Sequence, residues 1–190
     1  MTTKLSSVGE VISGHTFRGA IPHDKDGNYA VVQAKNINKD GTIDNNDLER
    51  TIIEKMRSKG TVQDGDVLLS NRGTFRSAVY RGDDTNVIVA SSLYILRVQQ
   101  SDLLPEYLMV FLNSPLGQQH LGILNRGTII QSIPRQSLLS LDVPVPTIKK
   151  QHTAISIYQN YHSRIALYER KTDLHEQVAN HALSLLLTHS

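Results

Sequence analysis

The sequence predicts an α+β fold, in which a mixed, strand-rich domain over residues 1–147 precedes one long C-terminal helix over residues 148–190 that pairs as a coiled coil. Two observations predict this fold. Short apolar runs separated by turn residues fill the first part, and a stretch without Pro or Gly fills most of the second. The length of 190 residues and the apolar content of 39% suit one domain with an appendage and argue against a disordered chain.

Five apolar, mostly β-branched runs predict the strands of the first part. They lie at 30–32, 67–69, 87–89, 94–96 and 128–130. Gly, Asp and Asn punctuate the sequence between these runs, as at 64–66, 81–84 and 125–127. The stretch VPVP at 143–146 lacks two backbone donors, so we expect an edge strand or a linker at the end of the domain.

Two helices are expected within the strand-rich domain. Pro105 occupies the position of a first-turn proline, the apolar residues at 108, 111 and 112 share a helical face, and 113–115 ends this helix. A weaker helix is expected from about residue 46 to 59, because 48, 52, 53 and 56 are apolar and Gly60 follows as a cap.

The long C-terminal helix is predicted from residues 149–187, which would span about 57 Å at 1.5 Å per residue. Its apolar residues recur at intervals of three and four with one phase slip near Thr172, which is an imperfect heptad pattern. Such a helix is too long to bury its apolar face on a small domain, so we expect it to pack on a second copy or a partner. A bent or broken pair of helices folded onto the first domain is the open alternative. The expected dimer-interface residues are Ile155, Tyr158, Ile165, Leu174, Val178 and Leu185.

Arginine is concentrated in the middle of the chain. Residues 67–140 contain six Arg and no Lys, although acidic and basic residues balance over the first 147 residues. The triplet Arg-Gly-Thr occurs at 72–74 and at 126–128, where Gly permits a tight turn, Arg offers a bidentate donor and Thr offers a hydroxyl or a methyl group. These features are compatible with contact with phosphates or base edges. Scattered surface arginines on plain hairpin turns are the alternative.

Neighbouring polar residues extend this set of DNA-contact candidates. Gln131 can bridge the donor and acceptor edges of adenine, whereas Lys35, Asn36 and Arg18 are expected to contact phosphates that set the register. The candidates are Arg72, Thr74, Arg76, Arg126, Thr128, Gln131, Ser132, Lys35, Asn36 and Arg18.

Several classes of function are disfavoured by what the sequence lacks. Without Cys there is no disulfide, thiolate zinc site, iron–sulfur cluster or Cys nucleophile. Neither a phosphate-binding Gly motif nor a nucleophile elbow is present. The segment 36–47 imitates a calcium loop, but it begins with Asn, ends with Asp and follows a predicted strand, so a turn is expected. We therefore expect no catalytic residues, no metal and no cofactor in this chain.

The sequence also bears on location. No apolar run approaches the roughly 20 residues that span a bilayer, and the first residues lack an apolar signal core. The expectation is a cytoplasmic protein with no membrane partner.

Eight segments, in this order, resemble one half of a Type I restriction–modification specificity (S) subunit. They are ISGHTFR at 12–18, VQAKNIN at 32–38, GDVLLSNRGT at 65–74, ASSL at 90–93, LPEYL at 104–108, LNS at 112–114, RGTIIQSI at 126–133 and VPVP at 143–146. The family's subunit ordinarily carries two target-recognition domains and two conserved helices, whereas this sequence holds one of each. The resemblance therefore implies a half-size form with a single target-recognition domain.

The resemblance implies a function and partners. A target-recognition domain of this family reads double-stranded DNA, and its paired helices set the distance between half-sites and dock an adenine methyltransferase (M) subunit. A homodimer would recognise an interrupted palindrome. S-adenosylmethionine is expected on the partner methyltransferase, and a restriction/translocase (R) subunit is a further expected partner. The near-neutral first domain keeps an alternative open, which is a protein-interaction or assembly module that does not read DNA. A stand-alone nuclease is disfavoured by the missing motifs.

Overall fold

A computed structural model describes residues 2–54, 60–125 and 131–188 of the chain. The chain divides into two compact units, Met1–Ala154 and Ile155–Ser190. The helix α5 (Ile148–Thr188) begins in the first unit and makes up the described part of the second. Among the described residues, none of the helices combines the length and the apolar character that crossing a membrane requires.

A four-stranded antiparallel sheet forms one layer of the first unit. Its order is β2 (Gly9–Ser13), β8 (Leu93–Val98), β5 (Val67–Ser70) and β6 (Ser77–Val79). β5 and β6 form a hairpin in which Leu68 pairs with Ala78. The buried strands β5 and β8 consist largely of Val, Leu and Ile, residues that pack well on a pleated surface.

A three-stranded sheet forms a second layer, in the order β4 (Glu49–Thr51), β3 (Tyr29–Val32) and β7 (Val87–Val89). β3 pairs antiparallel with β4 and parallel with β7. A two-stranded ribbon joins β1 (Thr2–Lys4) to β9 (Asp142–Pro144), so the expected edge strand around 143–146 is confirmed.

The hydrophobic core lies between the two larger sheets. Val32 and Val89 of the three-stranded sheet pack in one cluster with Leu68, Leu93 and Ile95 of the four-stranded sheet, and all five are fully buried. Burying such side chains contributes on the order of 1.5–3 kcal/mol each. This core holds β5, β6 and β8 rigid, and the loops at their ends are therefore presented from a fixed base.

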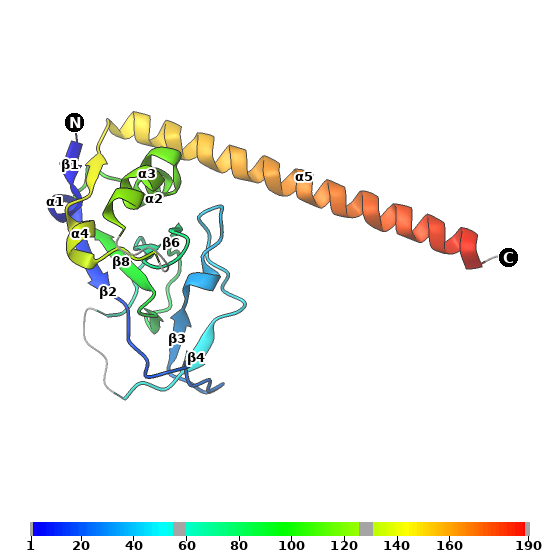
Figure 1. Cartoon of the computed structure of the whole chain (residues 1–190), viewed down its shortest axis with the longest axis horizontal. Helices are drawn as coiled ribbons and strands as arrows, with labels where there is room; N and C mark the ends of the chain where they lie inside the picture. Colours follow the sequence, from blue (N-terminus) through cyan, green and yellow to red (C-terminus); the bar gives the residue numbers. More distant parts are fainter. Residues whose placement is uncertain (1, 55–59, 126–130, 189–190) are drawn as a thin grey trace. The chain divides into compact units, whose positions relative to one another are not determined.

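Helices cover the β5–β6 side of the core (Figure 1). α2 (Pro105–Asn113) packs against β5 and β6, and α3 (Pro115–Leu124) packs against α2. The side chain of Asn113 ties the end of α2 to β6, because it accepts a hydrogen bond from the Ser77 amide (2.9 Å) and donates to the Ser77 carbonyl (2.8 Å). The predicted helix start at Pro105 and the break at 113–115 are both confirmed. Three shorter helical segments complete the unit, namely α1 (Leu5–Val8), the 3-10 helix η1 (Ala34–Asn36) and α4 (Arg135–Leu139).

The expected helix over 46–59 is wrong in its described part. Residues 49–51 form β4 and pair with β3, while 55–59 lie outside the described residues. The helical spacing of the apolar residues was misleading, because Leu48 packs at the edge of the core whereas Ile52 is 58% exposed. Four of the five predicted strand runs are confirmed, and the fifth, at 128–130, lies outside the described residues.

The predicted long helix is confirmed as α5, which runs unbroken for 41 residues (Figure 1). Beyond its first two turns, its apolar side chains are largely exposed, including Ile157, Leu167, Tyr168 and Val178 at 66–70%. Because α5 is one continuous helix, the alternative of a broken pair of helices is wrong. Whether α5 pairs as a coiled coil stays a prediction.

Candidate functional site

The first Arg-Gly-Thr triplet forms the loop between β5 and β6. Gly73 adopts a φ of +69°, a left-handed conformation that residues other than Gly rarely adopt. The Ser70 hydroxyl braces this loop, because it donates to the Thr74 carbonyl (2.5 Å) and accepts from the Arg76 amide (2.8 Å). The loop conformation is thus specified by its own residues.

The segment 131–133 lies beside this loop. Arg72 and Ser132 form an antiparallel bridge, the Gly73 amide donates to the Gln131 carbonyl (3.0 Å), and the Ile133 amide donates to the Asn71 carbonyl (3.0 Å). Two segments that are about 60 residues apart in the sequence, and that were predicted separately, are therefore brought together. Arg126 and Thr128 of the second triplet lie outside the described residues.

The side chain of Tyr94 on β8 holds the segment 131–133 through a hydrogen bond. Its buried hydroxyl donates to the Ile133 carbonyl at 2.9 Å. Burial raises the pKa of the Tyr94 phenol, and the positive charges of Arg135 and Arg72 oppose this effect. Arg135 follows the segment 131–133, which bonds both to Tyr94 and to the Arg72 loop, so we group Arg135 with Arg72.

Six side chains make up what we call the loop cluster: Arg72, Thr74, Arg76, Gln131, Ser132 and Arg135. Arg72, Thr74, Gln131 and Arg135 are exposed, whereas Arg76 and Ser132 are half-buried. Within the described part of the chain, no carboxylate lies within ion-pair distance of Arg72, Arg76 or Arg135. These cations therefore keep their charge available for an external anion.

Arg135 was missed by the sequence-based selection of contact residues. Its Nε donates to the Val11 carbonyl (2.7 Å), which orients the guanidinium at the first turn of α4. A signal was present in the sequence, since Arg135 lies two residues after the segment 131–133.

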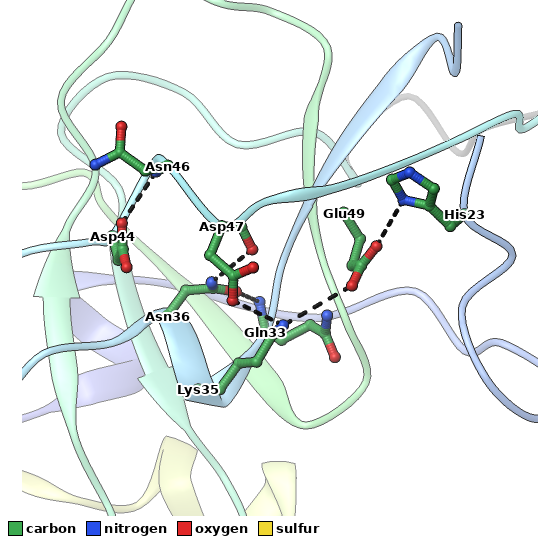
Figure 2. Close-up of polar contacts among 8 residues, drawn as sticks. All are labelled: His23, Gln33, Lys35, Asn36, Asp44, Asn46, Asp47 and Glu49. Atoms are coloured by element: carbon green, nitrogen blue, oxygen red, sulfur yellow. Dashed lines mark hydrogen bonds and ion pairs between the residues drawn. The ribbon is translucent and has the colours of Figure 1, made fainter. Parts of the chain in front are cut away.

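Lys35 and Asn36 lie in a polar network with Asp47 and Glu49 (Figure 2). The Lys35 Nζ is 2.9 Å from an Asp47 carboxylate oxygen and 3.8 Å from one of Glu49, which also contacts His23 Nδ1 (2.8 Å). The hydrogen bond with Asp47 raises the pKa of the Lys35 ammonium. Lys35 is thus partly neutralised, and its contact with a phosphate stays a prediction.

Asn36 is corrected from a phosphate contact to a structural residue. It is 1% exposed, its Oδ1 accepts from the Gln33 amide (2.9 Å) and its Nδ2 donates to the Asp47 carbonyl (3.1 Å), as Figure 2 shows. A side chain whose donor and acceptor are both used inside the fold is not available to DNA. Arg18, in contrast, is exposed in the segment between β2 and β3, and its role stays a prediction.

The calcium-like segment 36–47 is a set of turns. The Asp40 carboxylate accepts from both the amide and the hydroxyl of Thr42, and Gly41 adopts a φ of +80°. In the described ranges, no group of three or more His, Asp or Glu side chains is arranged to hold a metal ion.

The predicted dimer residues on α5 differ in exposure. Ile155 is 8% exposed, and its part in a dimer contact stays a prediction. Tyr158 is half-buried. Ile165, Leu174, Val178 and Leu185 are between 38% and 69% exposed and stay available to a second helix.

A strand-rich unit that presents a braced cationic loop, followed by a long helix with exposed apolar residues, defines a recognition module. A family model described as the Type I restriction modification DNA specificity domain matches residues 1–176. The chain belongs to this family, whose members are specificity domains and not catalytic ones. No curated protein matches the chain.

Solved structures share this fold. An S subunit of a Type-I restriction-modification system from M. genitalium has a TM-score of 0.59 and 17% identity, over 93% of this chain and 42% of that chain. A chain from a structure of the type I R-M system, titled for complex assembly and conformational transition, has a TM-score of 0.66 and 16% identity, over 93% and 42%. The HsdS subunit from Thermoanaerobacter tengcongensis has a TM-score of 0.57 and 18% identity, over 90% and 39%. The chain thus spans less than half the length of these relatives.

Proposed function

We propose that this chain is a DNA-binding specificity subunit of a Type I-like restriction–modification system, and that it reads DNA with the loop cluster. The observation that carries the proposal is the meeting of the Arg72 loop with the segment 131–133. At this meeting point, arginines that have no carboxylate partner among the described residues lie beside hydroxyl and amide groups. Guanidinium, hydroxyl and amide groups are the side chains that read base edges in the major groove.

The roles within the loop cluster follow from how each side chain is held. Arg72 and Gln131 are exposed on two adjacent backbone segments, so they are the proposed base-reading pair. Arg135 is oriented by its bond to a backbone carbonyl and is the proposed phosphate contact, which sets the register without reading sequence. Arg126 and Thr128 are retained as candidates from the sequence.

The exposed apolar residues of α5 support a homodimer in which two such helices pair as a coiled coil. An isolated helix with this much exposed apolar surface gains stability by packing against another helix. A two-fold dimer carries two identical reading units, so the proposed target is an interrupted palindrome. An adenine methyltransferase partner with bound S-adenosylmethionine would supply the chemistry after flipping the target base. A restriction/translocase subunit is a further proposed partner.

Selection from randomised duplexes by the purified full-length chain tests the proposal. The expected product is one short sequence repeated in inverted orientation around a fixed spacer, bound with an affinity that falls steeply as salt rises. Light scattering of the same sample should give the mass of a dimer. Recovery of no preferred sequence would contradict the proposal and would favour a protein-interaction module on the same fold.

Arg135→Ala sharpens this test. Loss of one phosphate contact should lower the affinity for selected and unrelated duplexes alike and reduce the slope of log affinity against log salt by about 1. The matched control is Arg50→Ala, since the Arg50 Nε also donates to a backbone carbonyl, that of Gly27, but lies on β4. An equal effect of both substitutions would contradict the assignment of Arg135.

A further inference from the structure

The first turns of α5 are anchored by one buried polar side chain. Gln151 is fully buried, although Gln is usually an exposed residue. Its Nε2 donates to the carbonyls of Asp102 (2.6 Å) and Pro146 (2.9 Å), and its Oε1 accepts from the Leu104 amide (2.9 Å). Both donors and the acceptor of this amide are therefore used by backbone groups of the first unit.

The three backbone partners of Gln151 belong to two segments that are far apart in the sequence. Asp102 and Leu104 form the loop before α2, and Leu104 caps its first turn, whereas Pro146 lies in the linker between β9 and α5. A backbone group left without a partner in a buried place costs about 1–3 kcal/mol. At this place in the helix, the amide of Gln151 meets all three needs.

This anchor continues toward the loop cluster through short contacts. α2, which begins beside Leu104, ends at Asn113, and Asn113 is hydrogen-bonded to both backbone groups of Ser77 on β6. β6 begins directly after Arg76. The start of α5 is thus tied through one rigid helix to the hairpin that carries Arg72.

We propose that Gln151 is a positioning residue that sets the spacing between two half-sites, because it holds the start of α5 in one register against α2. This inference rests on the proposed function, in which paired α5 helices separate two reading units. Apolar contacts alone tolerate sliding and rotation, whereas the two directional hydrogen bonds from Gln151 to Asp102 and Leu104 restrict both at the start of α5.

Distance measurements between spin labels test the mechanical part of the inference. The chain contains no Cys, so a pair introduced at the exposed positions Gln119 on α3 and Gln177 on α5 is labelled without background. Labelled chain is diluted into excess unlabelled chain, which leaves only intramolecular distances. Gln151→Met keeps the side-chain volume and removes all three hydrogen bonds, so the width of the distance distribution is expected to increase at least about twofold. His152→Ala, an exposed neighbour in the same turn, is the control and should leave the width unchanged.

Binding to duplexes with altered spacers tests the functional part. The selected half-sites are separated by the native spacer or by one to three base pairs more or fewer. Wild type and His152→Ala should prefer the native spacer, whereas Gln151→Met should lose about tenfold of this preference. Its affinity for a duplex with a single half-site should not change, which a loss of folded protein would not produce.

Each outcome has a defined consequence. A folded Gln151→Met chain with unchanged width and unchanged spacer preference would overturn the inference while the proposed function stands. A wild-type chain that selects no duplex would contradict the proposed function. The distances between spin labels would then test only whether Gln151 holds the start of α5. Gln151→Glu places carboxylate oxygens against the carbonyls of Asp102 and Pro146, so it should widen the distribution at least as much as Gln151→Met. If both variants fail to fold, Gln151 is a stability residue of the first unit and the inference is overturned.

Discussion

The two ends of the β5–β6 hairpin hold their arginines in opposite ways. At the loop end, residues 71–76, the guanidinium groups of Arg72 and Arg76 have no described carboxylate in reach. At the far end, Arg81 pairs with Asp64 (2.9 Å) and with Glu106, and Arg97 on the neighbouring strand pairs with Asp66 (2.7 Å).

The comparison teaches that arginine content locates a region but does not locate a site. Six arginines fall within residues 67–140, and in the folded chain two of the five described ones are neutralised by carboxylates. The charge that remains available gathers at the loop end of the hairpin, beside the segment 131–133. The far end uses the same residue type to hold the fold together.

The largest effect is expected at the far end, from Asp66→Ala. Asp66 is 2% exposed and receives two hydrogen bonds from the Arg97 guanidinium, at 2.9 and 2.7 Å, and one from the Gln63 amide at 2.8 Å. Its removal takes the carboxylate partner from the largely buried Arg97 guanidinium, which keeps a hydrogen bond to the Thr61 carbonyl (3.0 Å). The free energy of unfolding, measured in urea, should fall by about 3–5 kcal/mol.

The exposed pair at the same end provides the control for this measurement. Asp64→Ala breaks an ion pair whose side chains are both more than half exposed, and Arg81 keeps Glu106 as a partner. A loss of about 1 kcal/mol or less is expected. Equal losses for Asp64→Ala and Asp66→Ala would show that burial does not separate the two pairs.

At the loop end, Arg72→Ala should reduce DNA affinity while leaving stability almost unchanged. A lost bidentate contact with a base costs about 1–3 kcal/mol, which corresponds to an increase of about 5- to 150-fold in Kd. The measurement is a titration of the selected duplex, followed by fluorescence anisotropy, with a duplex mutated at one half-site position as reference. If Arg72→Ala unfolds the chain as Asp66→Ala does, Arg72 is a structural residue and the two ends are alike.

Tyr94→Phe probes the support beneath the loop cluster. It removes the hydrogen bond to the Ile133 carbonyl without changing the shape of the ring, so the free energy of unfolding should fall by about 1 kcal/mol. Tyr107→Phe is the matched control. Tyr107 is also buried, but burial alone acts on its phenol and no hydrogen bond to a described residue does, so no comparable loss is expected. Hydrogen exchange should be faster at the Ile133 amide in Tyr94→Phe alone.

Much of the first unit was predictable because its strands are encoded locally. The runs at 67–69 and 87–89 are apolar throughout, as expected for strands buried on both faces, and both are strands. The helix expected at 46–59 failed because the spacing of its apolar residues is also compatible with a strand edge, and pairing with β3 decided the outcome. The spacing of apolar residues therefore indicates where a helix or strand lies. At an exposed edge of a sheet, it decides less well which of the two forms.

The candidate site was predictable only in part, because its geometry is non-local. The bridge between Arg72 and Ser132 joins residues 60 positions apart, and no periodicity of apolar residues predicts such a contact. The neutralisation of Arg81 and Arg97 is equally hidden, since their carboxylate partners come from before β5 and from α2. Gln151 shows the same limit, because a polar residue in a long helix predicts an exposed position, whereas the loop before α2 buries it.

The smallest effect is expected from Arg81→Ala, and it is the sharpest test of the comparison between the two ends. Arg81 is about half exposed and its charge is matched by two carboxylates, so its loss should lower the free energy of unfolding by about 1 kcal/mol or less. Removing this cation should leave the Kd for the selected duplex within about twofold of wild type at the same salt concentration, because the loop end keeps Arg72 and Arg76. A loss of affinity equal to that of Arg72→Ala would mean that DNA also reaches the far end, and ion pairing would then not separate structural arginines from reading ones.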